Sequence, residues 1–288
     1  MKAQKQVKKT QKKAQKPLDG QMAVNENRFL SGSCDIFVAR LTEDERRKAC
    51  SFFDDGASIS TACSGTDTPV MCHNAIARSL GVEKEPHHAW SCEKVKWKAD
   101  FCVADSSNKS LPVWDDINKL EKGHTTGLID SRSDHRLPVE ATKVHTCCCC
   151  CHNVSTLKTD RSCEKDAVNA TGHGTTGETL DALLRHIAVS RPLVCIMENV
   201  PGFVKGEMVS EADENKALLE NGPALKLKFN NIGYEIDWRR VGALRIPVTR
   251  GRVFPVAIDI LQRPDASIVL NSAWTTLERL KRIWTLGH

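Results

Sequence analysis

A chain of 288 residues is long enough to bury the core of one large α/β domain or of two small ones. Its formal net charge of +5 comes from the N-terminus: residues 1–16 hold seven lysines and no acid, and without them the charge would be −2 (5 − 7). A segment so poor in apolar residues does not fold alone. We therefore expect residues 1–20 to be a disordered basic tail, either a solubilising segment or an arm for phosphate binding or nuclear import.

The sequence also bears on compartment. No apolar run reaches membrane-spanning length, and the N-terminus lacks the apolar centre of a secretory signal. We expect an intracellular protein without membrane contact, nuclear if the source is eukaryotic. The thirteen cysteines are an odd number scattered along the chain, which is unlike a secreted disulfide framework. Reduced thiols are therefore expected.

Short apolar stretches alternate with helical ones along most of the chain. Thr42 and Glu45 form a capping-box pattern at the start of a first helix. The βαβ order that follows indicates a parallel sheet with helices on both faces. Strands are expected at residues 57–63, 87–93, 192–199, 234–241 and 252–260, and helices at 70–81, 94–104, 177–190, 214–233 (interrupted at Gly222–Pro223) and 278–286. The charged, Gly- and Ser-rich residues 121–142 are expected to form a long loop.

The strand PLVCIMEN is continuously apolar but ends in Glu198. Ligands of open parallel sheets bind beyond the carboxyl ends of the strands. A glutamate at that edge could be a capping or salt-bridged group. Alternatively, it could be a functional acid whose pKa is raised by partial burial, so that it donates a proton.

A run of five cysteines and a histidine occupies residues 147–152. It could be a metal clamp, a disulfide knot or the surroundings of one nucleophile. Neighbouring cysteines point in alternate directions along an extended chain and lack the C-x2-C spacing of zinc ligands, which disfavours a metal site.

The segment VCIMENVPGFV resembles the Glu-Asn-Val motif of DNA cytosine-5 methyltransferases, and other segments follow in that family's order over roughly residues 57–260. ACSGTDTP resembles the first motif, a glycine turn that cradles the methionine part of S-adenosylmethionine. SCEKVKWKADF resembles the second, with an acid at the ribose hydroxyls, and PVWDDI the third, at the adenine. The cofactor residues implied are Ser64, Gly65, Thr66, Asp67, Thr68, Glu93, Asp116 and Ile117.

The same resemblance assigns the cysteine run. The family's nucleophile lies in a Pro-Cys-Gln motif followed, after two residues, by Ser. Counting back from Ser155 places Cys151 in the nucleophile's position, with His152 and Cys150 in place of Gln and Pro. The preceding cysteines would form the end of a strand and a turn.

The resemblance also implies a mechanism. The Cys151 thiolate would add to C6 of a flipped-out cytosine, which makes C5 nucleophilic toward the methyl donor. Glu198 would hydrogen-bond or protonate N3. Arg250 and Arg252, in the segment GYEIDWRRVGALRIPVTRGRVF that resembles the eighth motif, would hold the base carbonyl and the phosphate.

The resemblance implies a Rossmann-like methyltransferase fold for residues 57–262, with 263–288 as a C-terminal extension. DNA is the expected partner and S-adenosylmethionine the expected cofactor. The family's target-recognition domain and its last Gly-Asn motif are not recognisable. Two alternatives remain: a cytosine methyltransferase that acts on RNA, and a catalytically inactive homologue that binds nucleic acid or a partner protein.

Overall fold

The computed structural model describes residues 31–63, 65, 67–105, 111–130, 135–148, 174–204, 221–241 and 251–286. The predicted basic tail lies outside these residues.

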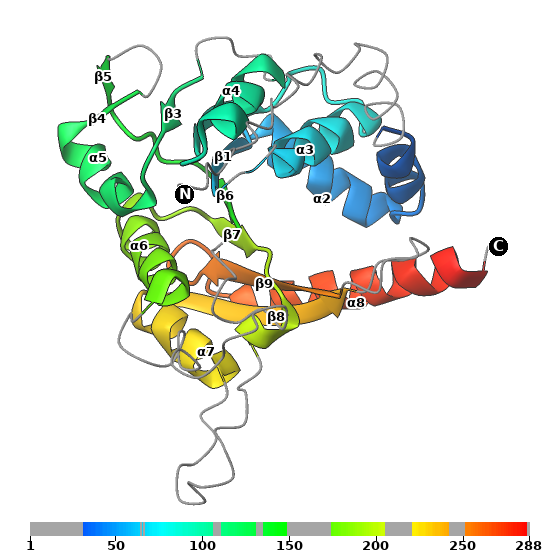
Figure 1. Ribbon diagram of the computed structural model, residues 1–288. Coiled ribbons are helices and arrows are strands. Elements are labelled where there is room, and N and C mark those ends of the chain that lie inside the picture. Colours follow the sequence, from blue (N-terminus) through cyan, green and yellow to red (C-terminus); the bar gives the residue numbers. More distant parts are fainter. Residues whose placement is uncertain are drawn as a thin grey trace, which may run out of the picture.

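The core of the molecule is one seven-stranded sheet (Figure 1). Its strands are β1 (Ser58–Ala62), β2 (His87–Cys92), β3 (Val113–Trp114), β6 (Val144–Cys147), β7 (Val194–Met197), β8 (Tyr234–Val241) and β9 (Arg252–Asp259). Their order is β3-β2-β1-β6-β7-β9-β8. The first five in this order are parallel neighbours, whereas β9 runs antiparallel to both β7 and β8. The predicted mostly parallel, Rossmann-like α/β fold is confirmed.

Helices cover both faces of this sheet (Figure 1). They are α2 (Glu43–Asp54), α3 (Thr68–Ser79), α4 (Lys96–Asp105), α5 (Leu120–Thr126), α6 (Gly174–Ser190), α7 (Asn221–Asn231) and α8 (Ala266–Leu286), with 3-10 turns η1 (Ile117–Lys119) and η2 (Pro201–Phe203). Strand alternation divides the core between the two faces. Val113 packs with α4 and Ile258 with α8 on one face, which also carries α3. Trp114 and Ala257, their neighbours in sequence, belong to the large cluster that includes α6 and α7 on the other.

The start of α2 is defined by a local sequence signal. The predicted capping box is present: the Thr42 hydroxyl accepts from the Glu45 amide, and the Glu45 carboxylate accepts from the Thr42 amide. Glu45 also accepts hydrogen bonds from Thr276 and Arg279 of α8, at 2.7 and 2.6 Å. Although burial acts in the opposite direction, these hydrogen bonds lower the pKa of Glu45 to about 2. The capping residue therefore also joins α2 to α8.

Two sequence predictions need correction. The expected long loop at residues 121–142 contains most of α5 and a two-stranded ribbon, β4 (Leu128–Ile129) and β5 (Arg136–Leu137). Tertiary packing outweighs its polar composition, because Leu120 and Gly123 are buried. The Gly222–Pro223 pair does not interrupt the described helix but lies in the first turn of α7, where proline's missing N–H has no cost.

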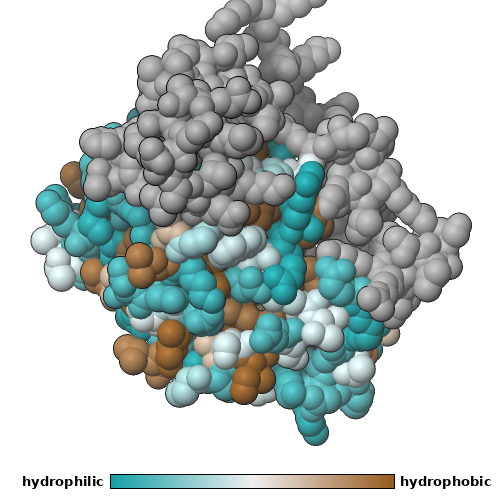
Figure 2. All heavy atoms as spheres, turned by 90° about the horizontal axis from the view of Figure 1, so that it is seen from below, coloured by the Kyte–Doolittle hydropathy of each residue, from teal (hydrophilic) through white to brown (hydrophobic). Residues whose placement is uncertain are grey.

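Among the residues that the structure describes, no helix combines the length and apolarity needed to cross a membrane. On the coloured part of the face seen from below, hydrophilic residues separate small groups of hydrophobic ones (Figure 2). Scattered exposed apolar side chains of this kind are normal for a folded surface.

Candidate active site

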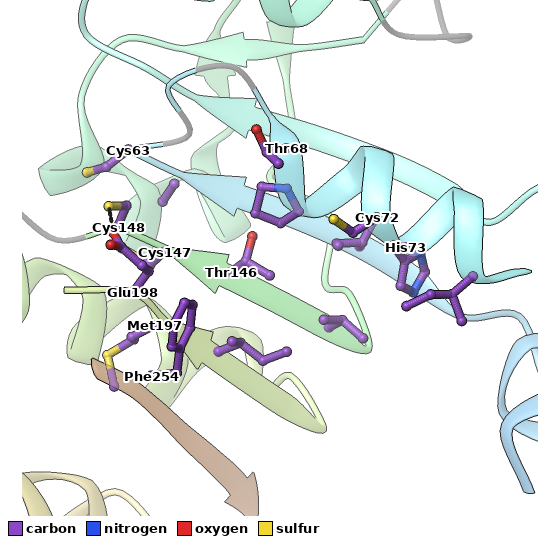
Figure 3. Close-up of a pocket in the computed structure, with 16 residues that line it drawn as sticks. Cys63, Thr68, Cys72, His73, Thr146, Cys147, Cys148, Met197, Glu198 and Phe254 are labelled. Atoms are coloured by element: carbon purple, nitrogen blue, oxygen red, sulfur yellow. Dashed lines mark hydrogen bonds between the residues drawn. The ribbon is translucent and has the colours of Figure 1, made fainter. Parts of the chain in front are cut away.

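The carboxyl ends of the parallel strands bring together segments that are far apart in the sequence. The turn after β1, the end of β6 and the end of β7 border one cavity of about 560 Å³, which continues under α3 (Figure 3). This volume is in the range of small-molecule sites. The cavity is lined by Ile59, Ala62, Cys63, Thr68, Pro69, Cys72, His73, Ile76, Val144, Thr146, Cys147, Cys148, Ile196, Met197, Glu198 and Phe254.

The glycine turn after β1 has an unusual backbone. Cys63, Gly65 and Asp67 all have positive φ, of 53°, 63° and 51°. Apart from its chain neighbours, a Cβ atom on Gly65 would meet no atom of the described residues within 4 Å, so those residues leave the backbone uncovered at this point. Only glycine takes this conformation without strain, which explains its place in the turn. An exposed backbone here suits close approach by a ligand.

Glu93 holds this turn. It follows β2, and its carboxylate accepts from the Gly65 amide and from the Val95 amide, both at 2.9 Å. The residue is 8% exposed. A carboxylate accepts more hydrogen bonds than these two, so capacity remains for ligand hydroxyl groups. Glu93, the residue predicted to bind the ribose, therefore lies in direct contact with the predicted glycine turn.

Asp67 points into the protein. It is 3% exposed, and its carboxylate accepts from the hydroxyls of Thr61 and Ser91, both at 2.6 Å. His88 Nε2 lies 3.9 Å away. Burial lowers the pKa of His88 even though the Asp67 charge acts in the opposite direction, which favours the neutral imidazole. The Asp67 side chain thus braces the turn from beneath.

The third predicted motif follows β3. The Asp116 carboxylate accepts from the Asn118 amide at 2.9 Å and caps the 3-10 turn η1. Ile117 is buried and packs in the large core cluster. The two residues lie at the same sheet edge as Glu93, because β3 is the parallel neighbour of β2.

The Glu198 side chain, which follows β7, contacts residues at the ends of β6 and β9, the two strands on either side of β7. Its Oε1 forms an ion pair with Arg252, the first residue of β9, and its Oε2 accepts a hydrogen bond from the Cys148 thiol at 2.7 Å (Figure 3). Its side chain remains 32% exposed. Glu198 is therefore a salt-bridged group, as one sequence alternative expected, and its side chain also lines the cavity.

Four predicted site residues, Ser64, Thr66, Cys151 and Arg250, lie outside the described residues. Thr68 begins α3 and lines the cavity. The cysteine run is described as far as Cys148, and Cys147 ends β6 as predicted. Among the described residues no group of His, Cys, Asp or Glu could hold a metal ion, and no disulfide joins the described cysteines.

Sequence reasoning missed three contributors to the site. Cys148 was assigned only to a strand end or turn, and the bracing hydroxyls of Thr61 and Ser91 were not singled out. The available signal was the presence of polar residues at the carboxyl ends of otherwise apolar strands. Their partners depend on which strands are neighbours, and the sequence did not give that order.

Comparison with known proteins gives one curated relative. Over 235 residues the chain is 23% identical to the DNA (cytosine-5-)-methyltransferase DMT5 of Cryptococcus neoformans var. grubii, a match that covers 79% of this chain. The predicted resemblance to DNA cytosine-5 methyltransferases is confirmed. The match covers only 8% of that relative's length. No family model matches the chain.

Solved structures resemble the chain more weakly. The Dnmt2 methyltransferase of S. pombe has a TM-score of 0.40 and 13% identity, covering 70% of this chain and 49% of that one. The methyltransferase EhMeth of Entamoeba histolytica has a TM-score of 0.44 and 12% identity, covering 70% of this chain and 52% of that one. The fold assignment therefore rests on the strand order of the sheet itself.

Proposed function

We propose that this chain is a divergent S-adenosylmethionine-dependent methyltransferase domain that methylates C5 of cytosine in DNA. The observation that carries the proposal is the position of Glu198, which Arg252 and Cys148 hold at the edge shared with the glycine turn. The turn after β1 and the strand ends at Cys148 and Glu198 are separate in the sequence but border the same cavity, which supports the proposal. The relative's activity on DNA supports the choice of substrate.

The residues at the edge fit the proposed cofactor. The described residues leave the Gly65 backbone uncovered, and Glu93 keeps hydrogen-bonding capacity beside it. Asp67 turns its carboxylate away toward the Thr61 and Ser91 hydroxyls, so it does not fill the turn. S-adenosylmethionine, when bound, supplies an electrophilic methyl group.

The chain's own groups carry the remaining chemistry. The Cys151 thiolate adds to C6 of the flipped base, because a thiolate is a strong nucleophile near neutral pH. Glu198 takes part in its protonated form, which donates its carboxyl proton in a hydrogen bond to N3 as electron density moves toward C5. Arg252 fixes the orientation of Glu198 and places a positive charge beside it. Arg250 is proposed to hold the base carbonyl or a phosphate.

Methyl transfer and covalent trapping test this proposal together. The full chain is incubated with labelled S-adenosylmethionine and, separately, DNA and RNA. A DNA containing 5-fluorocytosine should form a covalent adduct, because fluorine at C5 blocks release of the enzyme. Label in RNA alone would favour the RNA alternative. Absence of both label and cofactor binding would favour the inactive homologue.

Matched variants assign the roles. Cys151→Ser should abolish the adduct, whereas Cys149→Ser, two residues earlier in the same run, should retain it. Glu198→Gln keeps the shape but removes the charge and should lower the rate by roughly 10²–10⁴-fold. Glu93→Ala should weaken cofactor binding by about 1.5–3 kcal/mol, measured by calorimetry. An adduct that survives in Cys151→Ser would refute the assigned register.

The basic tail gives an independent test of nucleic-acid binding. Deleting residues 1–16 removes seven lysines and should flatten the salt dependence of DNA affinity, because fewer counterions are released. An unchanged slope would assign the tail to solubility or targeting and would leave the catalytic proposal intact.

A further inference from the structure

Cys63 and Cys147 are neighbours across two adjacent parallel strands. Ala62 of β1 is paired in register with Cys147 of β6, and Cys63 is the next residue along. Backbone hydrogen bonds fix both ends: the Cys148 amide donates to the Ala62 carbonyl at 3.2 Å, and the Cys63 amide to the Cys92 carbonyl at 2.8 Å. A strand spacing of about 4.8 Å and a rise of about 3.3 Å place the two Cα atoms about 6 Å apart, within the range that a disulfide spans.

The two thiols already interact. A hydrogen bond with Cys147 is the largest influence on Cys63 and lowers the pKa of its thiol, and the charge of Lys98 acts in the same direction against burial and Glu93. Burial instead raises the pKa of the thiols of Cys34, Cys72, Cys92 and Cys102. Among these five described cysteines, only Cys63 therefore has a thiol that ionises more readily than an ordinary cysteine thiol.

Access differs between the two partners. Cys63 is partly exposed and is one of the residues that line the cavity (Figure 3). Cys147 is 4% exposed and packs in the large core cluster. The accessible, more acidic thiol is suited to meet a small oxidant, and the buried thiol to react with it afterwards.

We propose that Cys63 and Cys147 form a reversible oxidation site that responds to hydroperoxides. The Cys63 thiolate attacks a peroxide oxygen, which gives Cys63 sulfenic acid and, with hydrogen peroxide, one water molecule. The Cys147 thiol then displaces the hydroxyl from that sulfur, which forms the Cys63–Cys147 disulfide and a second water. Two thiols are oxidised and one peroxide is reduced, and a dithiol reductant reverses the change.

The bond would alter the turn after β1. Cys63 begins this turn, and Gly65, two residues on, donates to Glu93 and accepts from the Cys102 thiol. Tying Cys63 to β6 draws its side chain toward the core and constrains the backbone that faces the proposed cofactor. Oxidation should therefore weaken cofactor binding. This consequence rests on the proposed function, whereas formation of the disulfide does not.

The test treats the reduced full chain with hydrogen peroxide, blocks remaining thiols and identifies linked peptides by tandem mass spectrometry. We expect a Cys63–Cys147 link that dithiothreitol removes. Cys63→Ser and Cys147→Ala should each lose it. Cys50→Ser should retain it, because Cys50 lies on α2, where its thiol donates a hydrogen bond to the Leu80 carbonyl after α3. A far-ultraviolet circular dichroism spectrum checks that each variant is folded.

Two outcomes would overturn the oxidation site: Cys63 linked instead to Cys148 or to another cysteine, or overoxidation of Cys63 without a link. Calorimetry with S-adenosylhomocysteine then tests the consequence, with an expected loss of affinity of about tenfold or more on oxidation and recovery on reduction. Unchanged affinity would refute the effect on the turn. If the reduced protein binds no cofactor, the proposed function fails while the peptide result still decides the oxidation site.

Discussion

The two faces of the central sheet are built differently. The face covered by α6 and α7 holds one continuous cluster, which runs from Trp114 of β3 through Cys195 of β7 to Ala257 of β9. The opposite face holds three small clusters, under α3, α4 and α8, that do not join. The cavity lies on this second face, between α3 and the strands β6, β7 and β9.

This difference separates two tasks. A continuous core contributes most of the hydrophobic stabilisation, because burial scales with the apolar area removed from water. A face with divided clusters leaves space over β7, the strand that leads to Glu198. We infer that the α6 face stabilises the fold and that the α3 face leaves room for the site.

The largest expected effect is the loss of stability when a buried side chain on the α6 face, called the closed face below, is truncated. Leu183 of α6 is fully buried, and Leu183→Ala should lower the free energy of unfolding by about 3–5 kcal/mol. Ile76→Ala on α3 should cost less than about half as much, because that side chain already borders the cavity. Urea denaturation measures both. Equal losses would contradict the proposed division of the faces.

The second largest expected effect is a loss of stability at acidic pH, caused by buried histidines on the closed face. His186 stacks on His124 there and also contacts the rings of His145 and Trp90. Burial lowers the pKa of all three histidines, that of His145 to about 3. Because the unfolded chain then binds protons that the folded chain does not, stability is full above the unfolded pKa of about 6.5 and falls as the pH decreases. Between pH 6.5 and 5, His145 alone should cost about 2 kcal/mol.

Urea denaturation across this pH range checks the expectation. His186→Gln should flatten the pH dependence, because one buried group no longer titrates. His87→Gln is the matched control: that imidazole is about half exposed, and its loss should leave the slope unchanged. A wild-type stability that does not change between pH 6.5 and 5 would contradict the prediction.

The smallest expected effect is a gain in stability from a substitution on the α3 face. The Thr146 hydroxyl lines the cavity, is buried and has no hydrogen-bond partner among the described residues. Thr146→Val removes this polar group at similar volume and should raise the free energy of unfolding by about 1 kcal/mol. Thr61→Val, one strand away, should instead destabilise, because it removes the donor to buried Asp67. Thermal unfolding distinguishes the two signs, and a destabilised Thr146→Val would show that the hydroxyl has a partner.

Local patterns were sufficient for much of the fold. The capping box at Thr42, the βαβ alternation and the apolar strand that ends at Glu198 follow from neighbouring residues, because helix and strand periodicities are short. The same patterns failed at residues 121–142, where α5 forms because Leu120 packs into the core rather than because of its own composition.

The sequence alone determined most of the helices and strands, the sheet edge that carries the acid and the resemblance that named its candidate ligands. Tertiary structure alone decided that Cys148 meets Glu198, that Asp67 turns inward and that Cys63 touches Cys147. These contacts join residues on different strands. They depend on strand order and register, which are set by how the two faces pack and not by the residues adjacent in the chain.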